Sequence, residues 1–141
     1  MSLLNRALAV ATAAHKGQTD KAGLPYLLHP LAVAASLPLA DLDGRTVALL
    51  HDTVEDTSVT LVDLAAWLPP HLVEAVDALT KRKGETLAAY WARCKANPVA
   101  ARVKVADMLH NSSPGRLRNL HPKDAARLAA KYKKGLDFFA L

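Results

Sequence analysis

The sequence predicts an all-α, single-domain protein, and three observations favour this fold class. At 141 residues the chain has the length of one domain that buries a sizeable core. Hydrophobic residues make up 51% of it, aromatic residues only 5%, and glycines number six, which favours helices over strands. Apolar residues recur at helical spacing, and no alternating strand pattern competes with them. We therefore expect a helical bundle.

Helix signals divide the first part of the chain into three elements. Helical spacing predicts a first helix over about residues 3–16. Because proline suits a first helical position, the next helix is expected over residues 30–36, with His29 as its N-cap and the imidazole free to point away from the helix. A third helix is expected after Asp43 as N-cap, and it carries residues 49–56 at its C-terminal end.

The second part of the chain shows equally clear helix starts. Thr60 and Asp63 form an approximate capping box, and Asn97 followed by Pro98 is a strong start signal. Helices are expected after Thr60, over residues 71–80, 85–95 and 99–111, and from Pro122 to near the C-terminus. Tyr90 and Trp91 should pack in the core. The last helix is strongly basic along Arg127, Lys131, Lys133 and Lys134.

Cysteine content, charge and hydropathy exclude several classes. The single cysteine, Cys94, excludes an internal disulfide and a cysteine-rich zinc site, and we interpret it as a small apolar residue in a helix. Apolar runs are short and interrupted by charges, so we expect a cytoplasmic protein without a signal peptide or a membrane partner. The formal net charge of +5 suits an anionic partner, either a nucleotide or a nucleic acid, or serves solubility. The oligomeric state stays open.

Residues 49–56 carry the strongest chemical signal. Directly after an apolar run, His51, Asp52, Glu55 and Asp56 place four ionisable side chains within six residues. Imidazole and carboxylate together suit a divalent cation such as manganese, iron or zinc. An adjacent His-Asp pair supplies only two ligands, and Asp107, flanked by apolar residues in its helix, is the strongest candidate for another. The alternatives are a helix end with solvated charges, and an aspartate on a polar face opposite Lys104.

Three motifs, in this order, resemble those of the HD-domain superfamily: His29-Pro30, His51-Asp52-Thr53-Val54-Glu55-Asp56, and Val105-Ala106-Asp107-Met108-Leu109-His110-Asn111. More closely, they resemble the hydrolase domain of RelA/SpoT homologues and the small alarmone hydrolases. The segments 14–18 and 25–30 match the entry to that domain. The resemblance covers nearly the whole chain and implies one HD-type helical phosphohydrolase domain over residues 1–141, with no synthetase or regulatory domain.

The resemblance also implies a role for individual residues. The metal ligands, typically for Mn²⁺, would be His29, His51, Asp52 and Asp107. The acidic pair that handles the attacking water would be Glu55 and Asp56. Substrate contacts would be Lys21, Tyr26, Lys81 and Asn111. The implied reaction, on a phosphorylated nucleotide, is metal-assisted removal of the 3′-pyrophosphate from guanosine tetra- or pentaphosphate.

Two positions depart from the family pattern. Asp20 stands before Lys21, where the family usually has arginine, and Ser113 stands where arginine commonly follows Asn111 at this distance. Because Asp20 cannot stack as a guanidinium does and repels phosphate, an adenosine alarmone, NADPH or another nucleotide stays open as substrate. A non-catalytic nucleotide-binding module also stays open, although a binder has no need of the acidic pair. Nucleic acid is disfavoured because no recognition helix is evident.

Overall fold

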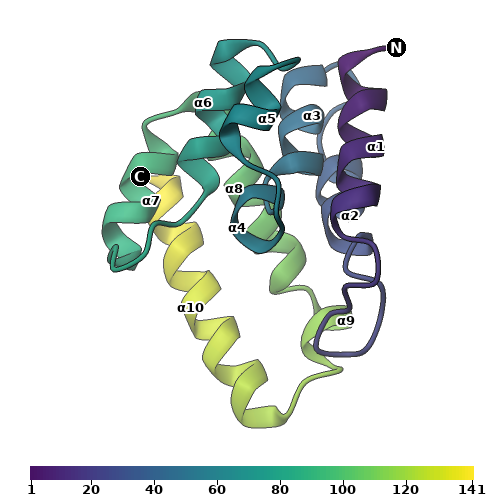
Figure 1. Cartoon of the computed structure of the whole chain (residues 1–141). Helices are drawn as coiled ribbons and strands as arrows, with labels where there is room; N and C mark the ends of the chain where they lie inside the picture. The colour runs from purple at the N-terminus through teal and green to yellow at the C-terminus, as the bar shows by residue number, and fades with distance from the viewer.

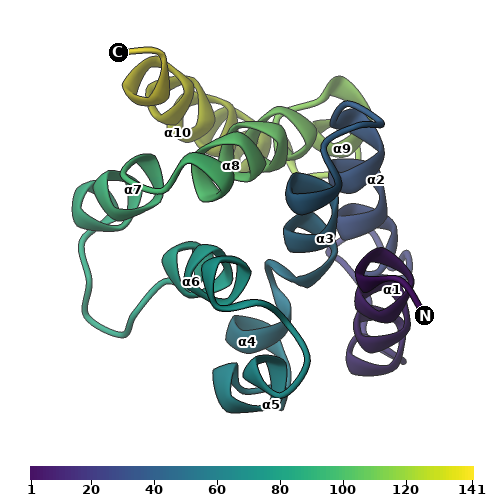
Figure 2. The ribbon, with the colours of Figure 1, turned by 90° about the horizontal axis from the view of Figure 1, so that it is seen from above.

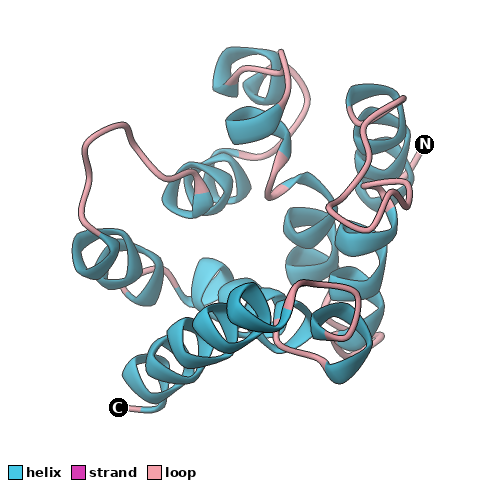
Figure 3. Ribbon diagram, turned by 90° about the horizontal axis from the view of Figure 1, so that it is seen from below, coloured by secondary structure: helices cyan, strands magenta, loops and turns pink.

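The computed structural model describes residues 1–141, and every regular element in it is a helix (Figure 3). The only β pairing is an isolated bridge between Thr19 and Pro25. This confirms the all-α fold class. No element reaches the combined length and hydrophobicity that a membrane-spanning helix needs. In chain order, as labelled in Figure 1, the helices are α1 (Leu3–Ala14), α2 (Leu28–Ser36), α3 (Leu42–Leu50), α4 (Thr53–Asp56), α5 (Leu61–Ala65), α6 (Pro70–Leu79), α7 (Leu87–Lys95), α8 (Pro98–Asn111), α9 (Pro114–Leu117) and α10 (Pro122–Ala140).

Helix α8 is the element around which the bundle is built. It packs against α2, α3, α6, α7, α9 and α10. Seen from above, α1, α2 and α3 lie on one side of α8, α6 and α7 lie on the other, and α10 runs beside it (Figure 2). Its apolar residues Val103 and Met108 are fully buried: Val103 belongs to the core cluster that includes leucines of α3 and α6, and Met108 lies beside Gly135 of α10. The site residues on α8 are therefore held by the best-packed part of the molecule.

Most of the predicted helix boundaries agree with the structure. Helices were expected over residues 71–80, over residues 99–111 and from Pro122 onward, and they are found as α6, α8 and α10. The Asn97 side chain accepts from the backbone N–H of Ala100 at 3.0 Å, and the capping box at Thr60 has both of its hydrogen bonds. Helix α9, which is only four residues long, was not predicted.

Two predicted N-caps are wrong. The N-cap of α3 is Asp41, whose Oδ1 accepts from the backbone N–H of Gly44 at 3.0 Å, and not Asp43. His29 does not cap α2 either: that helix begins at Leu28, two residues before the predicted start, and the imidazole of His29 is buried. Proline is tolerated throughout the first turn because the N–H groups there have no partner within the helix. Pro30 therefore did not mark the first helical residue.

Residues 49–56 do not form one helix end as predicted. Helix α3 stops at Leu50, a turn follows at residues 51–52, and the separate helix α4 begins at Thr53. Side chains bond the last carbonyls of α3: His51 Nδ1 lies 2.6 Å from the Ala48 oxygen, and Thr53 Oγ1 donates to the Leu50 oxygen at 2.7 Å. His51 therefore follows the end of α3, whereas Glu55 lies in the separate helix α4.

The core predictions near α7 are confirmed. Tyr90 and Trp91 are buried, as is Cys94, whose Sγ donates to the Ala78 carbonyl oxygen at 3.1 Å. Burial raises the pKa of the Cys94 thiol to about 11. The cysteine is therefore a structural residue that is protonated at neutral pH.

The close approach of α10 to α8 requires glycine at position 135. A Cβ added to Gly135 would lie 2.5 Å from Met108 Sδ and 3.0 Å from the Trp91 ring, whereas one added to Gly115 in α9 meets nothing within 4 Å. Both substitutions to alanine give a similar gain in helix propensity, so their difference isolates the overpacking. We expect the free energy of unfolding of Gly135→Ala to be about 1–3 kcal/mol below that of Gly115→Ala in urea denaturation. Equal stabilities would show that α10 can move away from α8.

Candidate metal centre and adjoining cavity

Three buried side chains from three helices converge on one point. His29 on α2, His51 at the end of α3 and Asp107 on α8 each direct one ligand atom inward, and these atoms lie within 4.8 Å of one another. His29 Nε2 lies 2.7 Å from Asp107 Oδ1, and His51 Nε2 lies 3.3 Å from the same oxygen. Two imidazoles and a carboxylate form a donor set that suits a divalent transition metal.

Asp52 lies beside this group. Its Oδ2 is 3.1 Å from His51 Nε2 and 3.8 Å from His29 Nε2, and the same oxygen accepts from the hydroxyl of Tyr26 at 2.6 Å. The adjacent side chains of His51 and Asp52 both reach this point from the turn between α3 and α4. The structure thus brings together all four residues that the resemblance implies as ligands.

The hydrogen bonding of His51 fits a metal ligand. A carbonyl oxygen only accepts, so the bond to Ala48 fixes the proton on Nδ1 and leaves a lone pair on Nε2. That Nε2 is buried and forms no well-aligned hydrogen bond, although carboxylate oxygens of Asp52 and Asp107 lie 3.1 and 3.3 Å away. A buried ring nitrogen without such a bond is costly unless something else satisfies it, and a metal ion in the group just described would do so.

His110 contacts the side of the His29 ring that faces away from the converging ligand atoms. The two Nδ1 atoms lie 2.7 Å apart, and the rings stack with centroids 4.9 Å apart. Burial, together with the nearby His29 and Arg116, lowers the pKa of His110 to about 4, so its ring is neutral at physiological pH. A neutral His110 can accept the Nδ1 proton of His29, which leaves His29 Nε2 free to bind a cation.

Lys104 and Asn111 hold Asp107 from the same helix. Lys104 Nζ lies 2.9 Å from Asp107 Oδ2, and Asn111 Nδ2 donates to Oδ1 at 3.1 Å. Burial alone would raise the pKa of Asp107, but Lys104 and the two histidines hold it well below its usual range. The alternative in which Asp107 lies on a polar face opposite Lys104 is wrong, because Asp107 is 4% exposed and paired with that lysine.

The two acidic residues of α4 lie next to the convergence point without joining it. Glu55 Oε1 accepts from the backbone N–H of Lys81 at 2.7 Å, which links α4 to the end of α6. Asp56 is exposed, yet partial desolvation and the charges of Asp52 and Glu55 raise its pKa to about 6. A carboxyl group with this pKa can exchange a proton near neutral pH.

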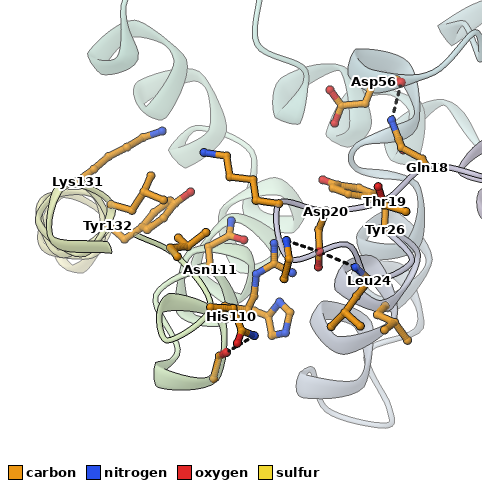
Figure 4. A pocket seen from close by; sticks show the side chains of 18 of the residues that line it. Gln18, Thr19, Asp20, Leu24, Tyr26, Asp56, His110, Asn111, Lys131 and Tyr132 are labelled. Atoms are coloured by element: carbon orange, nitrogen blue, oxygen red, sulfur yellow. Dashed lines mark hydrogen bonds between the residues drawn. The ribbon is translucent and has the colours of Figure 1, made fainter. Parts of the chain in front are cut away.

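Gln18 fixes the end of α4 through two hydrogen bonds. Its Nε2 donates to the backbone oxygen of Asp56 at 3.3 Å, as Figure 4 shows. Its Oε1 lies 2.6 Å from Nδ1 of the buried His15, which therefore donates. His15 is the C-cap of α1, so this contact connects α1 to the acidic pair.

Two adjoining cavities lie beside the converging ligands. The inner pocket, of about 210 Å³, is lined by residues including His29, Asp52, Asp107, Glu55, Lys81 and Lys104. The outer chamber, of about 770 Å³, lies between the loop at residues 17–27, the end of α8 and the helices α9 and α10 (Figure 4). Five residues line both cavities, namely Tyr26, Asp56, Asn111, Lys131 and Tyr132. A ligand of nucleotide size can therefore extend from the inner pocket into the outer chamber.

The substrate contacts implied by the resemblance fall on both cavities. Lys81 lines the inner pocket, Lys21 lines the outer chamber, and Tyr26 and Asn111 line both, although each of these two also bonds a candidate ligand. The contributions missed by sequence reasoning are those of Lys104, His110, Arg116, Arg127, Lys131, Tyr132 and Gln18. Two signals could have found some of them: Lys104 precedes Asp107 at i, i+3, and Arg127 and Lys131 share one helix face.

Both departures from the family pattern have structural roles. Asp20 Oδ1 accepts from the backbone N–H groups of Ala22 and Leu24 at 2.9 and 3.0 Å, which closes the loop in which Gly23 has a φ of +83°. Ser113 Oγ donates to the carbonyl oxygen of His110 at 2.7 Å at the end of α8. Asp20 also lines the outer chamber, whereas Ser113 holds the turn between α8 and α9.

The raised pKa of Asp56 gives a prediction for the metal-free protein. Its carboxyl carbon should titrate near pH 6 by NMR, and Glu55→Gln should lower that pKa because a neighbouring negative charge is removed. Since the folded-state pKa exceeds the ordinary value of 3.8, this group favours the folded state at low pH, and its contribution is lost as the pH rises through about 6. Asp63, on the far side of the capping box, serves as the control and should not respond to Glu55→Gln. An Asp56 pKa that is unchanged in Glu55→Gln would contradict the prediction.

Comparison with known proteins identifies the family to which this arrangement of residues belongs. The family model described as the HD domain matches residues 7–140. The chain belongs to the HD-domain family. This membership confirms the resemblance drawn from the three motifs, and the converging ligands described above lie on those motifs.

Curated relatives of this HD domain are much longer proteins. A probable GTP pyrophosphokinase of Mycobacterium leprae is 38% identical over 140 residues, which are 92% of this chain and 18% of the relative. A guanosine-3′,5′-bis(diphosphate) 3′-pyrophosphohydrolase of Vibrio cholerae is 45% identical over 80 residues, 55% of this chain and 11% of the relative. The chain thus spans less than a fifth of the length of these relatives.

A solved structure shares the fold. It is described as a metazoan ortholog of SpoT that hydrolyses ppGpp, and it matches with a TM-score of 0.68 over 99% of this chain and 94% of that one. The sequence identity is 22%, so this likeness supports the arrangement of helices in the HD domain.

Proposed function

We propose that this HD domain is a metal-dependent phosphohydrolase that removes the 3′-pyrophosphate of guanosine tetra- or pentaphosphate to give GDP or GTP. The observation that carries the proposal is the convergence of His29, His51 and Asp107 on one point, with the buried Nε2 of His51 left without a well-aligned hydrogen bond. The names of the relatives from Vibrio cholerae and the metazoan structure support the choice of substrate.

The proposed metal ligands are His29, His51, Asp52 and Asp107, and the proposed metal is manganese. When bound there, a divalent cation lowers the pKa of a water molecule and polarises a phosphoryl oxygen. Lys104 and His110 orient the ligands: Lys104 pairs with the second oxygen of Asp107, and His110 accepts the Nδ1 proton of His29.

Glu55 and Asp56 are proposed to handle the attacking water. Both line the inner pocket, and neither belongs to the converging group. Glu55 is held in place by the backbone N–H of Lys81, so its free oxygen can accept a hydrogen bond from the water. Asp56, with a pKa of about 6, can take the proton of that water and return it to the leaving oxygen.

A group of cations is proposed to neutralise the phosphates. Lys81, Lys104 and Lys131 line the inner pocket, and Arg127 and Lys131 line the outer chamber. Partial burial and the neighbouring charges of Lys104, Arg127 and Lys81 lower the pKa of Lys131, so these positive charges lie close enough to repel one another. An anion bound among them relieves that repulsion, which favours a substrate with several phosphates.

The test is a turnover assay of the protein loaded with Mn²⁺. Guanosine tetraphosphate, its adenosine counterpart and NADPH are offered in parallel, with Asp52→Asn as the control. We expect metal-dependent release of pyrophosphate from the guanosine compound and none with Asp52→Asn. Turnover of NADPH alone, or of none of the three, would reject the proposed substrate.

A further inference from the structure

The outer chamber combines an apolar wall with a single guanidinium that has no partner. Leu24, Leu28, Leu120 and Leu128 line it, and Tyr132 faces it from α10 (Figure 4). Two arginines also line it: Arg127 is paired with Asp124 at 3.5 Å, whereas Arg116 forms neither a hydrogen bond nor an ion pair through its side chain. A half-buried guanidinium keeps five donors, so Arg116 is equipped to bind something that enters the chamber.

Arg116 is presented by a rigid turn. Ser112 and Ser113 donate to the last carbonyls of α8, at Met108 and His110, at 2.8 and 2.7 Å. Pro114 then starts α9, and Asn119 Nδ2 donates to the Gly115 oxygen at 3.2 Å, which closes the turn. The guanidinium is thus attached to backbone whose ends are fixed, which lowers the entropy lost when it binds.

Arg116 stands apart from the phosphate-binding cations. Lys81 and Lys104 line only the inner pocket, whereas Arg116 lines only the outer chamber. The cationic group and the leucine-lined region therefore offer different chemistry. Phosphates match the first, and a planar ring with apolar faces and a polar edge matches the second.

We infer that Arg116 determines base specificity by donating to the acceptor edge of guanine from the leucine-lined part of the outer chamber. This inference rests on the proposed function. A guanidinium donates in a bidentate manner to O6 and N7 of guanine, whereas adenine presents a donor at the position of O6. Lys21 and two arginines bring cationic donors to this chamber, but only a guanidinium offers two parallel N–H groups. Since Arg127 pairs with Asp124, the unpaired guanidinium is that of Arg116.

The test is Arg116→Gln, with Arg118→Gln as the matched control. Arg118 is exposed, has no side-chain partner and does not line the chamber. Glutamine pairs with N6 and N7 of adenine, so Arg116→Gln should lower the ratio of kcat/KM for guanosine over adenosine tetraphosphate by about tenfold to hundredfold. Arg118→Gln should leave the ratio as in the unsubstituted protein. An equal fall for both nucleotides, or an unchanged ratio, would overturn the inference.

Equilibrium binding separates this inference from the proposed function. Dissociation constants for GDP and ADP are measured for the same three proteins by calorimetry, which needs no turnover. Absence of turnover would reject the proposed function, while loss of a GDP preference only in Arg116→Gln would still support the role of Arg116. A protein that binds GDP and ADP equally before substitution would overturn that role.

Discussion

Asp107→Ala is expected to bind its metal at least about 100-fold more weakly and to lose turnover as a result. Loss of an outer-shell partner already costs metal sites about 10- to 100-fold, and Asp107 lies within the converging group itself. The substitution also leaves Lys104, which is 13% exposed at its side chain, without its carboxylate. An uncompensated buried charge costs about 3–5 kcal/mol, so a lower melting temperature should accompany the loss of metal.

Metal content by mass spectrometry, with circular dichroism as the check on folding, tests this expectation. Asp137→Ala is the matched control, since Asp137 is an exposed aspartate on α10 that pairs only with Lys133. The control should keep its metal and its activity. Asp107→Asn is the second variant, because it preserves the shape of the side chain if the alanine protein does not fold. Metal retained in a folded Asp107→Asn or Asp107→Ala protein would remove Asp107 from the ligand set.

Glu55→Gln is expected to lower kcat by about 10²- to 10⁴-fold while metal stays bound, because general acid–base groups contribute factors of this size. Glutamine keeps the oxygen that accepts from the backbone N–H of Lys81, so α4 should stay in place. Glu74→Gln, an exposed position on α6, is the matched control and should be fully active. A Glu55→Gln protein that has lost its metal would make Glu55 a ligand instead of a group that handles water.

The helical fold could be predicted from local patterns, whereas the residues that converge were predicted from local patterns together with the resemblance to the HD-domain motifs. Asn97 followed by Pro98 marks the start of α8, and the helical spacing after it places Asp107 one turn before the helix end. The ordered motifs around His29 and His51 then supply the other candidates. That these three side chains meet is a result of packing, which the structure alone describes.

What the sequence did not predict depends on contacts between distant segments. The stacking of His110 on His29 joins residues 81 positions apart, and no periodicity indicates such a pair. The break after Leu50 was missed because it depends on two side-chain hydrogen bonds, from His51 and Thr53 to carbonyl oxygens of α3. Such bonds compete with the backbone hydrogen bonds of a helix, and the helical spacing of apolar residues does not reveal them. Helix α9 was missed because four residues are too few for a period to emerge.

The interruption between α3 and α4 sets a limit for anyone who engineers this protein toward higher thermal tolerance. The usual strategy replaces irregular turns with ideal helix, and here it would join Leu50 to Thr53 through residues 51 and 52. A variant such as Thr53→Ala removes a hydroxyl that bonds the Leu50 carbonyl and so makes a continuous helix easier to form. Such a helix would release the contacts that hold His51 and Asp52 beside His29 and Asp107, and the more robust protein would be the inactive one.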